Sequence, residues 1–335
     1  MIFVTGGTGL IGSHILLKLL QNGHSVRALK RKNSSMKIVQ STFSHYQQNE
    51  LLKSIEWVNG DILDFLSLDE AIEGCQKVIH CAAIVSFSAK DAQQMLAQNI
   101  NGTANIVNCC SKLNISKLLH ISSVAALGND PTLSIKNEEC NWKEDKTNTI
   151  YSRSKYLSEQ EVWRGIAEGL NAVIVNPSIV LGPGDWNKGS SQMFQKVWQG
   201  LKYYSSGGTG YVDVLDVAEI SVQLLESDII NERFIINAEN LKYKTVFEWI
   251  AEELNRPKPS VKVTPLLKEV AWRLEWLKSV VTAKKPLITK ETANKAMITN
   301  KYSNEKVRNH LSYSFIPIRQ SVSNYGKWFL KEQTT

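Results

Sequence analysis

This sequence contains little cysteine, and its cysteines lack the spacing of a metal site. Five occur among 335 residues. They are Cys75, Cys81, Cys109, Cys110 and Cys140. An odd count without ligand spacing is typical of reduced thiols, not of a disulfide framework or a zinc site. We therefore expect no disulfide framework and no bound metal.

Long apolar runs are also absent. No uninterrupted apolar stretch reaches the length that spans a bilayer. The apolar strand expected at residues 2–4 leaves no room for a secretory signal before it. Internal repeats and low-complexity linkers are missing as well, and a content of 43% apolar and 21% charged residues is ordinary for a soluble globular protein. These absences predict a cytoplasmic protein with one large core or two unequal cores.

Acidic residues are scarce in the C-terminal part only. Residues 242–335 contain 18 Lys and Arg against 8 Asp and Glu, a net charge of +10, whereas residues 1–241 contain 21 against 24, a net charge of −3. No nucleic-acid motif accompanies the basic part, so we expect no nucleic-acid partner. An anionic substrate, an anionic membrane surface and a merely solvated surface remain as explanations.

The most informative segment that is present lies at the start of the chain. Residues 2–4 are apolar, the motif Thr5-Gly-Gly-Thr-Gly-Leu-Ile-Gly12 follows, and an apolar helical pattern begins at Leu10. Glycine at a strand-to-helix turn leaves room for a phosphate, and the helix N-terminus offers N–H groups and a positive dipole end. The order strand, glycines, helix predicts a dinucleotide site, with a purely structural turn as the alternative.

Strand-like and helix-like segments alternate through the first half of the chain. The strand candidates are residues 2–4, 25–29, 55–59, 77–80, 117–122 and 171–176. The helix candidates are residues 13–22, 66–73, 92–113 and 152–168. This alternation predicts an α/β fold, a doubly wound parallel (Rossmann) sheet with helices on both faces.

We expect two domains. Residues 1–176 would form the dinucleotide-binding domain, whose sheet is completed by parts of 210–240, and residues 177–335 a smaller, mostly helical substrate-binding lobe. Residues 182–185 and 205–210 are expected to be loops because they are rich in glycine, proline and serine. The lobe would cover the carboxyl edge of the sheet, where ligands of open α/β sheets bind.

A second informative segment is Tyr151-Ser-Arg-Ser-Lys155. Residues four apart on a helix share a face, and an ammonium group beside a phenol lowers the phenol pKa from about 10 toward neutrality. The tyrosine then becomes usable as a general acid or base. Upstream, the strand at 117–122 ends in Ser122 and Ser123, whose hydroxyls would lie at the carboxyl edge of the sheet. Taken alone, the spacing of Tyr151 and Lys155 is usually that of a surface pair, and a polar strand terminus would explain the two serines equally well.

Together these motifs identify the chain as similar to the extended short-chain dehydrogenases/reductases of the NAD-dependent epimerase/dehydratase superfamily. The matching segments occur in the family's order: Thr5–Gly12, Gly60-Asp61, His80–Ala83, Asn99–Thr103, Ser122-Ser123, Tyr151-x-x-x-Lys155, Asn176–Ser178, Gly182–Gly184 and Val212–Asp216. The resemblance implies the doubly wound fold and a nicotinamide cofactor.

The resemblance also implies roles for individual residues. Tyr151 would donate and accept the proton, Ser123 would orient the substrate, Lys155 would bind the nicotinamide ribose, and Asn99 would support the lysine through water. The remaining cofactor contacts that it implies are Thr5, Gly6, Gly9, Leu10, Ile11, Gly12, Asp61, Ile62, Ala82, Ala83, Pro177 and Ser178. Relatives often pair through helices of the sheet domain, so a homodimer is a further expectation.

No acid ends the predicted second strand. Members that prefer NAD carry one there to hold the adenosine ribose, whereas this strand runs into Lys30-Arg31-Lys32. A cation at this point suits a 2′-phosphate, and Arg31 can bind it with two parallel hydrogen bonds. We therefore predict NADP(H) in preference to NAD(H).

The sequence around Ser123 separates the branches of the family. Val124-Ala125 stand where the sugar dehydratases carry an Asp-Glu pair, and residues 151–159 resemble the dihydroflavonol reductase-like and 3β-hydroxysteroid dehydrogenase-like members. We expect oxidation or reduction at a carbonyl or secondary alcohol of a small, apolar-faced substrate. Phe87 and Trp186 are candidate substrate contacts, with packing as their alternative role. A nucleotide-sugar epimerase that retains its cofactor and a non-catalytic sensor of cofactor redox state are the alternative functions.

Residues 265–285 combine apolar side chains at helical spacing with tryptophan and basic residues. The apolar positions are Leu266, Leu267, Val270, Leu274, Leu277 and Val281. Trp272 and Trp276 share a flank of this helix. An interior helix of the lobe is one explanation. The other is a helix that lies on an anionic membrane surface or covers a lipid-like substrate.

Overall fold

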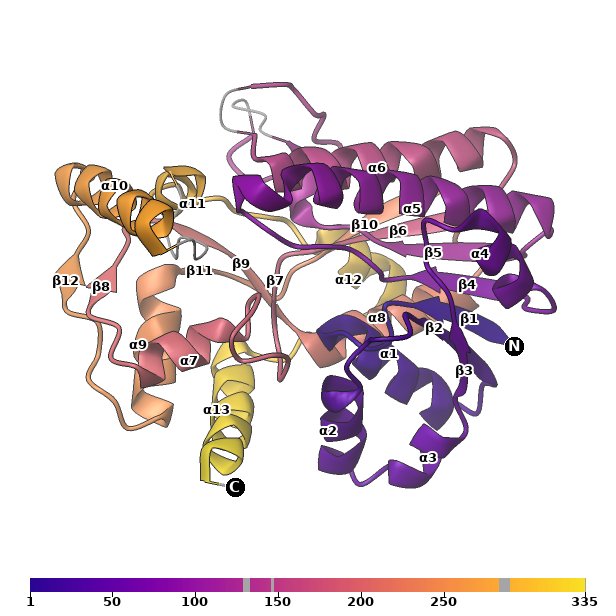
Figure 1. The fold of residues 1–335 in the computed structure, drawn as a ribbon, viewed down its shortest axis with the longest axis horizontal. Coiled ribbons are helices and arrows are strands. Elements are labelled where there is room, and N and C mark those ends of the chain that lie inside the picture. Colours follow the sequence, from indigo (N-terminus) through magenta and orange to yellow (C-terminus); the bar gives the residue numbers. More distant parts are fainter. Residues whose placement is uncertain (129–132, 146–147, 283–289, 335) are drawn as a thin grey trace.

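The computed structural model describes residues 1–128, 133–145, 148–282 and 290–334. Seven parallel strands form its main sheet, in the order β10-β6-β5-β4-β1-β2-β3 (Figure 1). These strands are β1 (Ile2–Thr5), β2 (Val26–Lys30), β3 (Glu56–Asn59), β4 (Lys77–His80), β5 (Lys117–Ile121), β6 (Ala172–Pro177) and β10 (Glu232–Ile236). The predicted doubly wound α/β sheet is confirmed, and the six predicted strands end within a residue of the observed ones.

Helices cover both faces of this sheet. On one face lie α4 (Phe65–Ile72), α5 (Ala92–Lys112) and α6 (Ile150–Ala167), and on the other α1 (Leu10–Gln21) and α8 (Val214–Glu226) (Figure 1). The first strand shows why: Phe3 packs into the core on one face while Ile2 and Val4 pack into the core on the other. A strand that is buried on both faces needs a continuous run of apolar residues, and the run at residues 2–4 is the feature that predicted this strand.

The connections reverse direction between β1 and β4. Thr5, the last residue of β1, pairs with Leu29 of β2 on one side and with His80 of β4 on the other. The chain proceeds outward from β1 toward β3 and then crosses back to β4 and β5. Ligands of open α/β sheets bind at such a switch point, beyond the carboxyl ends of the strands. The glycine motif, which follows β1 directly, therefore lies at this crevice.

The C-terminal lobe contains more strand than the sequence predicted. Its small sheet consists of β7 (Ile179–Leu181), β9 (Gly208–Asp213) and β11 (Glu239–Lys242), and β8 (Tyr203–Tyr204) pairs with β12 (Val261–Lys262). The expectation that 205–210 forms only a loop was wrong, because β9 begins at Gly208 and is buried between β7 and β11. Within 210–240 the chain returns to the main sheet through α8 and β10, which pairs with β6.

The remaining helices belong mainly to the lobe and to the segment after β2. They are α2 (Lys37–His45), α3 (Asn49–Lys53), α7 (Gln192–Trp198), α9 (Tyr243–Glu253), α10 (Pro265–Thr282), α11 (Lys290–Lys295), α12 (Glu305–Leu311) and α13 (Ile318–Thr334). Within the described parts of the chain, no helix is both long enough and apolar enough to cross a membrane.

Candidate active site

The glycine turn between β1 and α1 has the shape that a diphosphate requires. Gly6 has a φ of +72°, and a Cβ there would lie 2.7 Å from the backbone nitrogen of Ala82. A Cβ on Gly12 would lie 2.2 Å from the Gly6 carbonyl oxygen. Gly9 is the N-cap of α1 and supplies no side-chain cap to the N–H groups of Leu10, Ile11 and Gly12. The turn therefore accepts only glycine and leaves these donors to an anion, which fits a nicotinamide dinucleotide.

A buried hydrogen-bond chain connects this turn to α5. The N–H of Ala82 donates to Thr5 Oγ1, which lies 2.7 Å from His80 Nδ1, while His80 Nε2 lies 3.1 Å from Thr103 Oγ1. The Thr103 hydroxyl donates to the Asn99 carbonyl, so it must accept from His80 Nε2–H. Because a neutral imidazole carries one N–H, Nδ1 is then an acceptor, and the Thr5 hydroxyl donates to it. Burial lowers the pKa of His80 to about 3, which keeps the ring neutral in this arrangement. Sequence reasoning had given His80 and Thr103 no role of their own.

Two basic residues stand where β2 ends. The carbonyl of Lys30 accepts from Gly60 N–H, and the backbone N–H of Arg31 donates to Ser34 in the following exposed turn. Among the described residues, neither side chain forms an ion pair. Across from this turn, Asp61 accepts from Leu63 N–H, whereas Ile62 is buried against Gly102. Ile62 can therefore reach a cofactor mainly through its backbone.

Tyr151, Ser123 and Phe87 lie together at the carboxyl edge of the sheet. The Ser123 hydroxyl lies near enough to the Tyr151 phenol to lower its pKa, and it accepts from Ala125 N–H at 3.2 Å, which leaves its own proton to donate. The ring of Phe87 meets the Tyr151 ring edge to face, with centroids 5.6 Å apart. Phe87 is 41% exposed, so it can pack on Tyr151 and still offer apolar surface beside the phenol.

Lys155 lies one turn beyond Tyr151 on α6 but points to the sheet. Its Nζ donates to the Ile121 carbonyl at 2.8 Å, and burial lowers its pKa to about 8, against the opposing effect of Glu159 and Cys81. Burial raises the pKa of Tyr151, while the Ser123 hydrogen bond lowers it. The expectation that Lys155 brings the Tyr151 pKa below its ordinary value is therefore not met in this structure, because desolvation of the phenol outweighs the other effects.

Asn99 has a different set of partners from the expected one. Its amide donates to the Ile84 carbonyl and to Ser154 Oγ, and its side-chain oxygen accepts from Ile84 N–H at 2.8 Å. These bonds tie the segment after β4 to the helix that carries Tyr151. None of them reaches Lys155, so the water-mediated support of the lysine stays a prediction.

The other predicted contacts are distributed between the crevice and the core. Ala82 and Ala83 follow β4, Ala82 half-buried and Ala83 exposed, and Pro177 ends β6. The buried Ser178 is bonded to Ile236. Trp186, in contrast, is buried among Phe194 and Phe329, and its indole N–H donates to Glu332. Trp186 is therefore a packing residue of the lobe, and its proposed contact with substrate is corrected.

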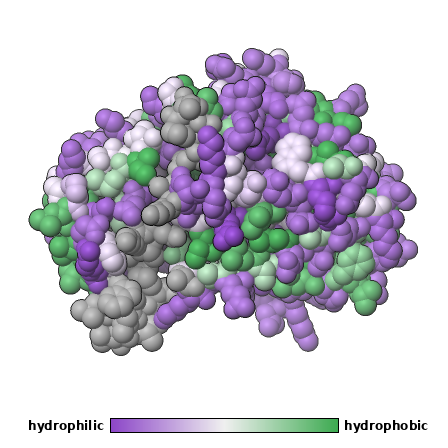
Figure 2. Space-filling view, turned by 90° about the horizontal axis from the view of Figure 1, so that it is seen from above, coloured by the Kyte–Doolittle hydropathy of each residue, from purple (hydrophilic) through white to green (hydrophobic). Residues whose placement is uncertain are grey.

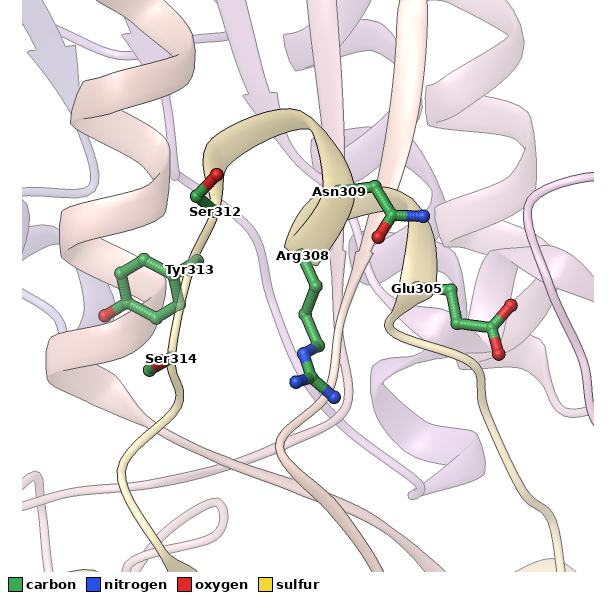
Figure 3. A pocket seen from close by; sticks show the side chains of 6 residues that line it. All are labelled: Glu305, Arg308, Asn309, Ser312, Tyr313 and Ser314. Atoms are coloured by element: carbon green, nitrogen blue, oxygen red, sulfur yellow. The ribbon is translucent and has the colours of Figure 1, made fainter.

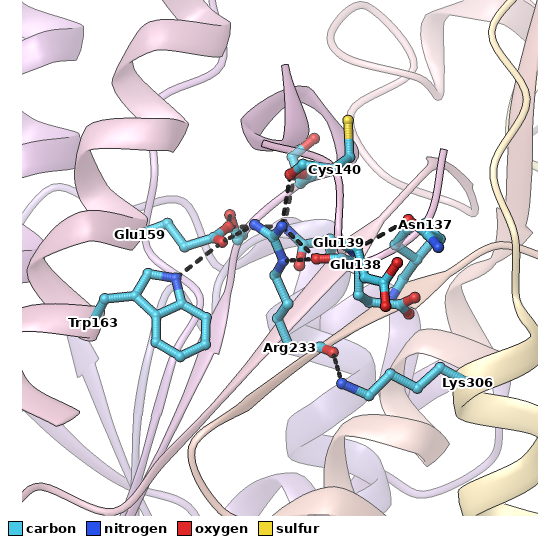
Figure 4. A network of polar contacts seen from close by, with 12 residues as sticks. Asn137, Glu138, Glu139, Cys140, Glu159, Trp163, Arg233 and Lys306 are labelled. Atoms are coloured by element: carbon cyan, nitrogen blue, oxygen red, sulfur yellow. Dashed lines mark hydrogen bonds and ion pairs between the residues drawn. The ribbon is translucent and has the colours of Figure 1, made fainter. Parts of the chain in front are cut away.

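Sequence reasoning missed a buried polar network behind the serines (Figure 4). The hydroxyl of Ser122 donates to Glu159, which also accepts from Asn176 and pairs with Arg233. This network occupies the hydroxyl of Ser122 and leaves that of Ser123 facing Tyr151. Glu159 belongs to the family motif at 151–159, but no local signal marks Arg233, because its partners lie far away in sequence.

A polar hollow on the surface contains none of these residues (Figure 3). It lies between α12 and the segment that follows it, and is lined by Glu305, Arg308, Asn309, Ser312, Tyr313 and Ser314. Its donors and acceptors are ordinary surface groups, so the site at the carboxyl edge of the main sheet remains the candidate for chemistry.

Comparisons with known proteins agree with this geometry. Residues 2–237 match the NAD dependent epimerase/dehydratase family. A protein of Synechocystis sp. provisionally named a dihydroflavonol 4-reductase is 28% identical over 98% of this chain and 94% of its own length. Cinnamoyl-CoA reductase 1 of Petunia hybrida is 30% identical over 70% of this chain and 72% of its own length. The crystal structure of gox2253 superposes with a TM-score of 0.82 and 30% identity, covering 99% of this chain and 98% of that one.

Proposed function

The chain belongs to the NAD dependent epimerase/dehydratase family, and we propose that it is an NADP(H)-dependent oxidoreductase acting at a carbonyl or secondary alcohol of a small, apolar-faced molecule. One observation carries this proposal: the Tyr151 phenol lies near enough to Ser123 for that hydroxyl to lower its pKa, and it is flanked by the exposed ring of Phe87. A proton donor, an oxygen-orienting hydroxyl and an apolar wall are thereby brought together at the carboxyl edge of the sheet.

Each side chain has a distinct task in the reductive direction. A nicotinamide cofactor, held by the glycine turn and Lys155, would supply the hydride chemistry when bound. Tyr151 donates its proton to the carbonyl oxygen, and the free hydroxyl proton of Ser123 hydrogen-bonds that oxygen as negative charge develops on it. Lys155, whose pKa burial lowers to about 8, remains largely cationic at neutral pH and would hold the nicotinamide ribose.

The preference for NADP(H) is supported by the end of β2. Lys30 ends this strand and Arg31 follows it, with no acid at either position, and the exposed Arg31 is the side chain that can bind a 2′-phosphate with two hydrogen bonds. Both curated relatives are named as reductases, which favours net reduction over epimerisation. We expect the purified protein to oxidise NADPH in the presence of members of a ketone panel.

This panel also tests the alternatives. Net loss of NADPH absorbance with at least one apolar-faced ketone, and slower loss of NADH, is the expected result. Turnover of a nucleotide sugar with no net change in cofactor absorbance would instead establish an epimerase. Cofactor binding without turnover of any ketone or alcohol would instead favour a non-catalytic sensor of cofactor redox state.

We further propose that α10 contacts an anionic lipid surface. Leu266, Val270 and Leu274 lie four residues apart on this helix and are 76%, 45% and 61% exposed, so an interior position is excluded for these three. Figure 2 shows apolar side chains at the end of the molecule where α10 and β12 lie. Trp272 donates to Glu269 and is covered by Arg273. The side chains of residues 276–282, and residues 283–289, lie outside the described part of the chain.

The charge of the surrounding segment indicates which partner would bind the exposed apolar side chains of α10. The surrounding segment 242–335 carries a net charge of +10, so two copies of the chain would repel each other there, whereas anionic lipid would be attracted. Co-sedimentation in low salt with vesicles of phosphatidylcholine and phosphatidylglycerol tests this. Binding should fall on adding salt and with Leu266→Ser/Leu274→Ser, but not with Leu66→Ser, which removes a 71% exposed leucine from α4. No sedimentation, or sedimentation unchanged by the double substitution, would overturn the proposal.

A further inference from the structure

Three consecutive residues at the end of β5 are each held by a buried polar side chain. Lys155 Nζ donates to the carbonyl of Ile121 at 2.8 Å, and the hydroxyl of Ser122 donates to Glu159 Oε2 at 2.8 Å. Asn176 Nδ2 donates to the Ser123 carbonyl at 3.0 Å and to the same Glu159 oxygen at 2.8 Å. The peptide segment that carries Ser123 is thereby fixed from behind.

The carboxylate at the centre of this arrangement is almost completely buried. Glu159 is 1% exposed, and its second oxygen accepts from Arg233 at 3.2 Å and from Trp163 Nε1 at 3.4 Å (Figure 4). Arg233, on β10, donates its other N–H groups to the carbonyls of Glu138 and Cys140. Every donor around the carboxylate is therefore supplied by a different element of the fold, which holds it in a single orientation.

Glu159 also stands one helical turn beyond Lys155. The other titratable groups near this ammonium are His80 on β4, Cys81 after it, His120 on β5 and the tyrosine one turn earlier on α6. Burial lowers the pKa of both histidines and raises the pKa of the thiol and the phenol, so all four favour their uncharged forms. Glu159 is the carboxylate among these neighbours, and it opposes the desolvation of Lys155.

We propose that Glu159 and Arg233 form a positioning pair for the reaction. Glu159 aligns Ser123 through Ser122 and Asn176 and keeps Lys155 protonated, and Arg233 limits how much of that negative charge the lysine experiences. The inference rests on the proposed function for its catalytic readout. It assigns roles to two side chains that neither need nor are able to touch the substrate, because both lie behind the strand end.

The pH dependence of kcat/KM with NADPH and a turned-over ketone tests this pair. Glu159→Gln removes the negative charge, so the alkaline limb should move to lower pH, by about one unit. Arg233→Gln removes the competing positive charge, so the limb should move to higher pH. Glu159→Asp keeps the charge but shortens the reach to Ser122. Glu159→Asp should therefore leave the alkaline limb of the pH profile in place and lower kcat.

Arg27→Gln is the matched control. Arg27 pairs with Glu56 at 2.8 Å and donates to the carbonyls of Ala71 and Glu73, a geometry like that of Arg233 but at the opposite end of the sheet. It should lower the unfolding temperature comparably and leave the limb unmoved. If all variants lost activity only in proportion to their lost stability, with the limb unchanged, the pair would be merely structural and the proposal would be wrong.

A second readout keeps this test separate from the proposed function. The pH dependence of NADPH affinity, followed by fluorescence quenching, reports the charge of Lys155 without turnover. If the native protein reduced no ketone, the proposed function would fail, while opposite shifts of the affinity profile in Glu159→Gln and Arg233→Gln would still support the positioning pair. Identical profiles would reject it.

Discussion

The rings of Tyr151 and Phe87 meet edge to face with centroids 5.6 Å apart, and the Ser123 hydroxyl lies near enough to the Tyr151 phenol to lower its pKa. In the proposed function, the polar neighbour serves proton transfer and the apolar contact shapes the space beside it. A substrate oxygen that approaches both hydroxyls must therefore bring its carbon skeleton against Phe87. This relationship leads to the first two predictions.

Tyr151→Phe removes the proton donor and nothing else from this arrangement. We expect kcat to fall by roughly 10²–10⁴-fold, because general acid–base catalysis contributes about that much. NADPH affinity should stay within a few-fold of the native value, since only the hydroxyl group is lost and the aromatic ring remains. Substantial residual turnover at saturating substrate would contradict the role of Tyr151.

Phe87→Ala removes the apolar wall and leaves the hydroxyl pair in place. Aromatic pairs contribute about 0.5–1.5 kcal/mol beyond their buried area, so kcat/KM should fall by up to about tenfold for substrates with a large apolar face. A small polar ketone should lose much less. Phe87→Leu, which keeps apolar bulk, is the control, and equal losses for both substrate classes would argue against a wall function.

The cofactor preference should depend on the end of β2. We expect Lys30→Ser/Arg31→Ser to raise the KM for NADPH by at least about tenfold, because charge-assisted hydrogen bonds to a phosphate contribute about 1.5–3 kcal/mol. The KM for NADH should change little. Lys32→Ser, in the same exposed turn, is the matched control, and a preference for NADH in the native protein would refute the assignment.

Gly6→Ala tests the phosphate turn. Gly6 and Gly23 both have positive φ values, +72° and +81°, so the backbone conformation alone should make alanine cost about 1–2 kcal/mol of unfolding free energy at either position. Only at Gly6 would the new Cβ meet backbone, 2.7 Å from the nitrogen of Ala82. NADPH affinity measured by fluorescence should therefore collapse in Gly6→Ala and persist in Gly23→Ala. Equal affinities would show that the turn does not hold the cofactor.

A buried carboxylate at the start of α8 should make stability depend on pH. Burial, with Asp213 adding to it, raises the pKa of Asp216 to about 7 from its ordinary 3.8, although Tyr313 and the N–H of Ile316 donate to it. Figure 3 shows Tyr313 on the segment after α12. As the pH rises, the Asp216 carboxyl stays protonated to a higher pH in the folded state than in the unfolded state. The stabilising contribution of this protonation is therefore complete below about pH 4 and is lost as the pH rises through about 7.

Unfolding temperatures measured across this range check the sign. The contribution of Asp216 should decline by up to about 4 kcal/mol between pH 4 and pH 7. Asp216→Asn holds the group neutral, so the variant should lose this decline and gain stability relative to the native protein as the pH rises. Parallel curves for the two proteins would mean that the carboxylate ionises equally easily in both states.

Local patterns in the sequence were sufficient for much of this molecule. The strand at 2–4, the glycine turn and the four-residue spacing of Tyr151 and Lys155 each depend on contacts within a few residues, so they could be predicted before the fold was known. The order of the apolar strands then determined a parallel sheet, because short connecting helices permit little else. The prediction of a site at the carboxyl edge follows from the same reasoning.

Only the tertiary structure decided which side chains distant in sequence contact one another. Glu159 meets Arg233 across 74 residues of sequence, and Trp186 meets Glu332 across 146, so no local pattern could reveal either contact. Burial also set the signs of effects that spacing suggested differently: Lys155 turns to the Ile121 carbonyl, and the phenol beside it is desolvated. Local geometry follows from the order of residues, whereas desolvation and long-range pairing depend on which surfaces the completed fold encloses.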